Sequence, residues 1–140
     1  MIVLPPSLRF ALRANSLTAR ILAERDQSFD PLPVLKLFNP LGAATWIATE
    51  LDEDDDTLFG LADLGFGCPE LGSFSLREIA HVRLPFGLSI ERDLSFEPLR
   101  PLSVWADRAR RTGSIVLAEA ELRNAATTLP SDIPSPPDRR

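Results

Sequence analysis

The stretch that decides the fold is residues 44–75, ATWIATELDEDDDTLFGLADLGFGCPELGSFS. It holds two apolar segments, 45–51 and 57–64, which are joined only by the five acidic residues 52–56. A connection of five residues suits a hairpin, whereas parallel strands need a crossover of a dozen residues or more. The stretch therefore predicts two antiparallel strands, followed by a glycine-rich turn and a third short strand.

Both strands of this hairpin carry apolar residues on both faces. In the first strand, the two-residue period predicts Trp46 and Ala48 on one side and Ile47 and Leu51 on the other. Strands with two apolar faces are typical of the centre of a sheet that is covered twice. We therefore place the hairpin in the middle of a layered structure, with Trp46 and Trp105 filling the core on opposite sides.

Further elements flank the hairpin on both sides. Residues 34–38, VLKLF, predict a strand that ends at an Asn-Pro turn. Residues 88–96 alternate in polarity, which predicts an edge strand with one solvated face. The residues expected to share one side of that strand are Leu88, Ile90, Arg92, Leu94 and Phe96.

Four segments have helical patterns. Residues 6–25 predict one bent helix or two short ones, because Asn15 and Ser16 are expected to interrupt the helical pattern. Residues 76–82 predict a helix capped by Ser75. Residues 102–111 and 115–126 predict two more, the first of which ends before Gly113. We thus predict one α+β domain over residues 1–126, a mainly antiparallel sheet of four or five strands with helices packed on it, and a disordered tail rich in Pro and Ser at 127–140.

Composition excludes several classes of function. The 140 residues carry a net charge of −5, which opposes non-specific nucleic-acid binding through many phosphate contacts. One Cys and one His cannot supply the usual zinc ligand sets, and we predict neither a metal nor a cofactor. Residues 37–49, the longest charge-free apolar run, are too short to cross a membrane, and the first ten residues do not resemble a signal peptide. We expect a cytoplasmic protein.

Nine short motifs together resemble a bacterial family, the domain-of-unknown-function family 2958. They are VLKLFNP at 34–40, GAATW at 42–46, TELD at 49–52, FGL at 59–61, DLG at 63–65, PELG at 69–72, SL at 75–76, ERD at 91–93 and RPLS at 100–103. The resemblance spans roughly residues 4–115. It implies a place in plasmids, integrated conjugative elements or phage-like regions, and it implies no activity and no catalytic residues.

An acidic run is the first candidate site. It consists of Glu50, Asp52, Glu53, Asp54, Asp55 and Asp56. Such carboxylates bind Ca²⁺ or Mg²⁺ when their spacing is right, but this spacing lacks the glycine and the terminal Glu of an EF-hand. The run also suits a phosphate mimic that occupies a nucleic-acid-binding partner. The structural alternative is a solvated hairpin connection.

The glycine-rich turn is the second candidate site. Its glycines are Gly65, Gly67 and Gly72, with Asp63 on the strand before it and Glu70 within it. Paired carboxylates with separated pKa values do acid–base chemistry or hold a metal, and Glu50 is a possible third member. The structural alternative is a carboxylate that accepts backbone N–H bonds and so fixes the turn.

These patterns lead to three functional hypotheses. The first is a non-catalytic binding or accessory module in the biology of mobile DNA, acting on a protein or nucleic-acid-processing partner. The second is a small enzyme with a carboxylate-centred site near Asp63 and Glu70. The third is the phosphate-mimic hairpin. The edge strand is compatible with a monomer or with a homodimer formed by strand pairing.

Overall fold

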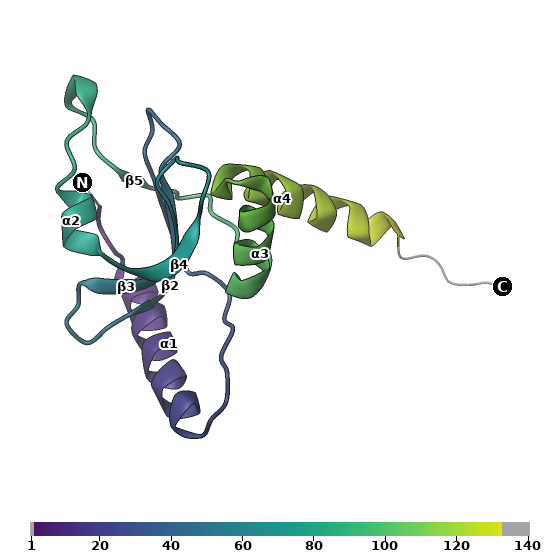
Figure 1. The fold of residues 1–140 in the computed structure, drawn as a ribbon. Coiled ribbons are helices and arrows are strands. Elements are labelled where there is room, and N and C mark those ends of the chain that lie inside the picture. Colours follow the sequence, from purple (N-terminus) through teal and green to yellow (C-terminus); the bar gives the residue numbers. More distant parts are fainter. Residues whose placement is uncertain (1, 133–140) are drawn as a thin grey trace.

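The β2–β3 hairpin lies at the centre of an antiparallel sheet (Figure 1). The computed structural model describes the backbone of residues 2–132 and the side chains of residues 2–127. Within that part of the chain the strand order is β4-β3-β2-β1-β5. The elements are α1 (Pro6–Glu24), β1 (Leu35–Phe38), β2 (Thr45–Leu51), β3 (Thr57–Asp63), β4 (Glu70–Ser75), α2 (Leu76–Ala80), a 3-10 turn η1 (Pro85–Gly87), β5 (Glu91–Arg92), α3 (Leu102–Thr112) and α4 (Ile115–Asp132). The predicted α+β class and the antiparallel sheet are confirmed.

Helices cover the sheet on both faces, as the doubly apolar strands predict. Leu12 of α1 and Ile79 of α2 pack with Trp46 on one face. Trp105 of α3 and Ile115 of α4 pack with Ile47 on the other. Figure 1 shows α2 and α3 on opposite sides of the strands. The two tryptophans therefore fill two separate cores, as predicted.

A bulge in β2 overturns one part of the predicted strand pattern. Thr45 to Ala48 pair with Asp63 to Gly60, but the register then shifts so that Glu50 pairs with Phe59. One extra residue on β2 reverses the sides of all residues that follow it. Leu51 consequently packs with Trp46 and Ala48, not with Ile47 as the simple alternation predicts. The same shift moves Glu50 to the face of Phe59.

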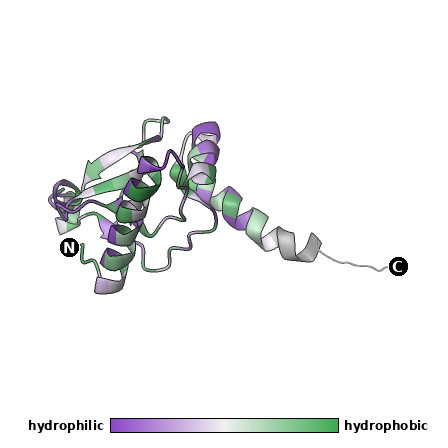
Figure 2. Cartoon of the chain, turned by 90° about the horizontal axis from the view of Figure 1, so that it is seen from below, coloured by the Kyte–Doolittle hydropathy of each residue, from purple (hydrophilic) through white to green (hydrophobic). Residues whose placement is uncertain are grey.

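The helix α1 is continuous, so the predicted interruption near Asn15 is absent. Asn15 and Ser16 lie within its 19 residues, and the Asn15 side chain donates to the carbonyl of Thr49 at 2.9 Å. This hydrogen bond to β2 stabilises Asn15 in the helix, although Asn by itself has a low helix propensity. Figure 2 shows hydrophobic and hydrophilic residues alternating along α1, as expected for a helix with one buried face.

The predicted edge strand is much shorter than residues 88–96. β5 contains only Glu91 and Arg92, which pair with β1 at the sheet edge. Asp93 then ends the strand, because its carboxylate accepts from the N–H of Ser95 at 2.9 Å and closes a turn. The expected common side is lost: Ile90 is buried, whereas Leu94 is 80% exposed.

The last two helices pack against the face that carries Lys36 of β1. The Lys36 ammonium is 2.6 Å from Glu119 of α4 and 3.2 Å from Asp93. Gly113 ends α3 in the left-handed conformation at φ +80°, as a helix-stopping glycine does. α4 then runs from Ile115 to Asp132, past residue 127, where the sequence pattern predicts the start of a disordered tail. The rest of the predicted tail, 133–140, lies outside the described residues.

No helix in the described part of the chain combines the length and the hydropathy that crossing a membrane requires.

Candidate functional site

The acidic hairpin is bound to the rest of the fold by nearly all of its carboxylates. Arg20 of α1 pairs with Asp52 at 3.5 Å and with Glu53 at 3.3 Å. Arg9 of the same helix pairs with Asp55. These contacts fasten the β2–β3 connection to α1. They also mean that the run is not a free array of negative charge.

Asp54 and Asp56 organise the turn and its junction with α2. The Asp54 carboxylate accepts from the Thr57 hydroxyl, from the Thr57 N–H and from the Asp56 N–H. These bonds, led by that of the Thr57 hydroxyl, lower the pKa of Asp54 from its ordinary 3.8 to about 2. Asp56 accepts from the Ser75 hydroxyl at 2.8 Å and from the Arg77 N–H at 2.7 Å. Both carboxylates therefore have structural roles.

Glu50 is the exception in this acidic run. Among the described residues, no hydrogen bond or ion pair reaches its carboxylate. Burial raises the pKa of Glu50 above its ordinary 4.5, and the nearby Asp52 carboxylate raises it further. A carboxylate that is partly desolvated and unpaired costs folding free energy. Residues held at such a cost are candidates for function.

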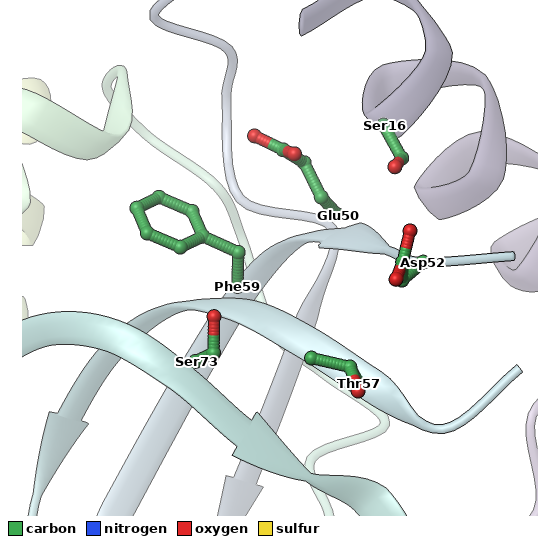
Figure 3. Close-up of a pocket in the computed structure, with 6 residues that line it drawn as sticks. All are labelled: Ser16, Glu50, Asp52, Thr57, Phe59 and Ser73. Carbon is green, nitrogen blue, oxygen red and sulfur yellow. The ribbon is translucent and has the colours of Figure 1, made fainter. Parts of the chain in front are cut away.

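A cavity of about 290 Å³ lies beside Glu50 (Figure 3). Its lining comes from α1, β2, β3 and β4 and consists of Ser16, Glu50, Asp52, Thr57, Phe59 and Ser73. Glu50 pairs with Phe59 and Phe59 with Ser73, so these three side chains form one row across three strands. Figure 3 shows them rising on the same side of the sheet. The cavity thus combines an unpaired carboxylate, an aromatic face and hydroxyl groups.

Replacing Glu50 with glutamine is expected to stabilise the protein at neutral pH. The raised pKa means that the folded state binds a proton more tightly than the unfolded chain does, so the ionised carboxylate opposes folding above that pKa. The gain in melting temperature from Glu50→Gln should shrink as pH falls through the raised pKa, where wild-type Glu50 becomes neutral. Thermal melts from neutral to acidic pH measure it. Glu53→Gln, which removes an exposed and paired carboxylate, should not show this gain.

Asp63 lies apart from Glu50, and its carboxylate is hydrogen-bonded to backbone N–H groups. It is 1% exposed, and its two oxygens accept from the N–H of Gly65 at 2.8 Å and of Ile115 at 3.0 Å. One carboxylate thereby fixes the start of the glycine-rich turn and the start of α4. Asp63 therefore has the structural role given above as the alternative to catalysis: its carboxylate accepts backbone N–H bonds and fixes the turn.

Glu70 is not brought together with Asp63. Glu70 pairs with Ala62, the residue before Asp63, and neighbouring residues of a strand point to opposite faces. Glu70 is exposed and lines a small hollow of about 120 Å³ with Ala62, Leu64, Phe66 and Cys68. Gly65 and Gly67 shape the turn with positive φ, and Gly67 packs against Gly113, while Gly72 is a β4 residue at the sheet edge. In the residues 2–127, whose side chains are described, no group of three His, Cys, Asp or Glu could hold a metal ion.

The outer edge of β4 is the second feature of this region. The N–H of Leu76 donates to the carbonyl of Asp56 at 3.0 Å, which continues the β3–β4 ladder by one pair. Since bonded pairs alternate along an antiparallel ladder, Phe74, Gly72 and Glu70 bond to β3. The backbone groups of Leu71 and Ser73 therefore point outward. Among the described residues, no hydrogen bond outside the ladder reaches the backbone of residues 70–74.

Sequence reasoning did not find Phe59, Ser73 or Ser16 as neighbours of Glu50. Without the bulge, Glu50 would face the opposite core, and the row Glu50–Phe59–Ser73 would not exist. The available signal was Glu50 itself, an isolated charge in an otherwise apolar strand. It singled out the residue but not its surroundings.

The comparisons with known proteins identify the family. A family model described as "Protein of unknown function (DUF2958)" matches residues 3–116. Neither curated proteins nor solved structures gave a match. The matched region covers α1 to the first residues of α4, including the hairpin, the cavity and β4. The chain therefore belongs to the domain-of-unknown-function family 2958, as the nine motifs predicted.

Proposed function

We propose that this protein is a non-catalytic binding module that takes up an extended, basic segment of a partner protein along the edge of β4. The open edge is the observation that carries the proposal. β4 offers outward backbone groups at Leu71 and Ser73, which is the arrangement that strand addition uses. The bound segment would extend the sheet by one strand.

The two edges of the sheet differ in a way that supports this function. β5 is two residues long and ends in a turn, which blunts its edge. β4 is six residues long, contains no Pro, Lys or Arg, and has a single charge, Glu70, at its end. Proteins usually protect long edges against pairing with other chains. An edge left open beside a protected one is typical of a binding surface.

Charge indicates the chemistry of the partner. The chain carries a net charge of −5, and the cavity lined by Glu50 and Ser73 reaches β4. A basic segment is complementary to both features. Pairing of β4 with β4 of a second copy would not bring a basic residue to the cavity. The residue opposite Ser73 would then be Leu71, Ser73 or Ser75 of the second copy.

The other two hypotheses have less support from the geometry. An enzyme centred on Asp63 and Glu70 requires two carboxylates that converge, and these two lie on opposite faces. A phosphate mimic requires free negative charges, and Arg9 and Arg20 pair with three of the carboxylates. The proposed setting, the cytoplasm of a bacterial host that carries mobile DNA, rests on the family resemblance.

The test uses short peptides selected from a random display library against the 140-residue chain. In amide hydrogen exchange, the N–H groups of Leu71 and Ser73 should exchange more slowly in the peptide complex than in the free protein. Ser73→Pro removes an outward N–H without removing a ladder bond, so it should abolish peptide binding while the protein stays folded. Ser73→Ala keeps this N–H and a small side chain at the same position, so it serves as the folding and binding control. If bound peptides leave both amides unprotected and bind Ser73→Pro normally, the proposed site is wrong.

A further inference from the structure

We propose that the segment bound along β4 carries an arginine opposite Ser73, and that this side chain crosses Phe59 to bind the carboxylate of Glu50. The inference rests on the proposed function, since it names the residue that the β4 site would recognise. It assigns a specificity pocket to the cavity beside Glu50.

The register of the sheet defines the path of that side chain. Residues directly opposite each other on neighbouring strands point to the same face. Because Ser73, Phe59 and Glu50 are such neighbours, a residue added opposite Ser73 becomes the fourth member of their row. Three strand spacings separate it from Glu50, roughly 14 Å between Cα atoms. The Glu50 side chain and one hydrogen bond span part of this distance. The added residue must span the rest, which only the longest side chains can do.

The groups along the path select a cation with an extended planar head. Ser73 offers a small side chain at the entrance, so a long stem can pass over it. Phe59 comes next and offers a ring face, on which a guanidinium stacks more favourably than an ammonium. Glu50 then offers two oxygens without a partner among the described residues. Arginine satisfies all three positions at once.

The neighbouring carboxylates show why Glu50 is the residue left for a ligand. Asp52 also lines the cavity, but Arg20 of the same chain already pairs with it. Arg13, the other α1 arginine near the end of β2, donates to the carbonyl of Leu51 at 3.1 Å. Within residues 2–127 the chain thus provides its own cations for the surrounding acceptors and none for Glu50. A cation from outside would relieve the cost of the partly buried charge.

A double-mutant cycle between peptide and protein tests the inference. The probe is a selected peptide whose register on β4 is known from amide protection, and its residue opposite Ser73 is arginine or its neutral isostere citrulline. On the wild-type protein, citrulline should weaken binding about ten-fold. On Glu50→Gln the same exchange should have little effect. Glu53→Gln carries the same change of charge outside the cavity, so it should behave as the wild type does.

The outcomes separate this inference from the proposed function. If peptides protect Leu71 and Ser73 but citrulline binds as tightly as arginine, the arginine pocket is wrong and the strand-binding function remains. An equal loss on wild type and on Glu50→Gln also overturns the pocket, because the cation would then bind elsewhere. If peptides never protect β4, both proposals fail together. If the exchange of arginine for citrulline weakens peptide binding only in proteins that keep Glu50, the result supports both the strand-binding function and the arginine pocket.

Discussion

Replacing Gly60 with alanine is expected to destabilise the protein by about 3 kcal/mol or more. A Cβ atom at this position would lie 1.9 Å from the carbonyl oxygen of Ile47 and 2.8 Å from the Cα of Ala48. Both obstacles are backbone atoms of β2, so no side-chain rotation relieves the clash. The central strands β2 and β3 would have to move apart, and the two cores that they separate would be disturbed.

Gly72 provides a matched control for this prediction. It is the direct cross-strand partner of Gly60, and a Cβ atom there meets nothing within 4 Å. Gly72→Ala should therefore leave stability unchanged or raise it slightly, since glycine is unfavourable in a strand. Urea denaturation measures both variants on the same scale. Equal effects at the two positions would contradict the close approach of β2 to Gly60.

Replacing Asp63 with alanine is also expected to lower the free energy of unfolding by about 3 kcal/mol. The change removes two charge-assisted hydrogen bonds in a buried site, and it leaves the N–H of Ile115 without an acceptor. α4 would lose the contact that fixes its first turn to the sheet. In hydrogen exchange, the amides of Gly65 and Ile115 should exchange faster than in the wild type.

Two further substitutions separate the causes of this effect. Asp63→Asn keeps one acceptor oxygen, so it should cost less than Asp63→Ala. Glu70→Ala removes an exposed carboxylate from the opposite face and should change stability by no more than about 0.5 kcal/mol. A large effect of Glu70→Ala would show that the two carboxylates depend on each other, in conflict with their placement on opposite faces.

The predictions that held depend on local patterns. The two apolar runs and the five-residue acidic connection predicted the central hairpin, and Ser75 caps α2 by accepting from the N–H of Glu78 as the capping box predicted. Gly113 likewise ends α3. Each signal lies within a few residues of the element that it defines, so one chain is enough to read it.

The predictions that failed depend on contacts between distant segments. Asn15 argues for a helix break until its side chain meets Thr49, which lies on β2. The edge strand at 88–96 alternates well, but its bonding to β1 ends with the N–H of Asp93, which donates to the carbonyl of Lys36, because the Asp93 side chain closes a turn. Such competition between local pattern and tertiary contact decides how far an element extends.

Sequence alone determined the α+β class, the central hairpin and the family, and it marked Glu50 as a charge on a mostly apolar strand. Tertiary structure decided on which face that charge lies. The physical reason is the bulge after Ala48: when a strand is apolar on both faces, alternation contains no mark of an extra residue, and only pairing with β3 reveals the shift. That shift places Glu50 beside Phe59, in the row that leads to the open edge at Ser73.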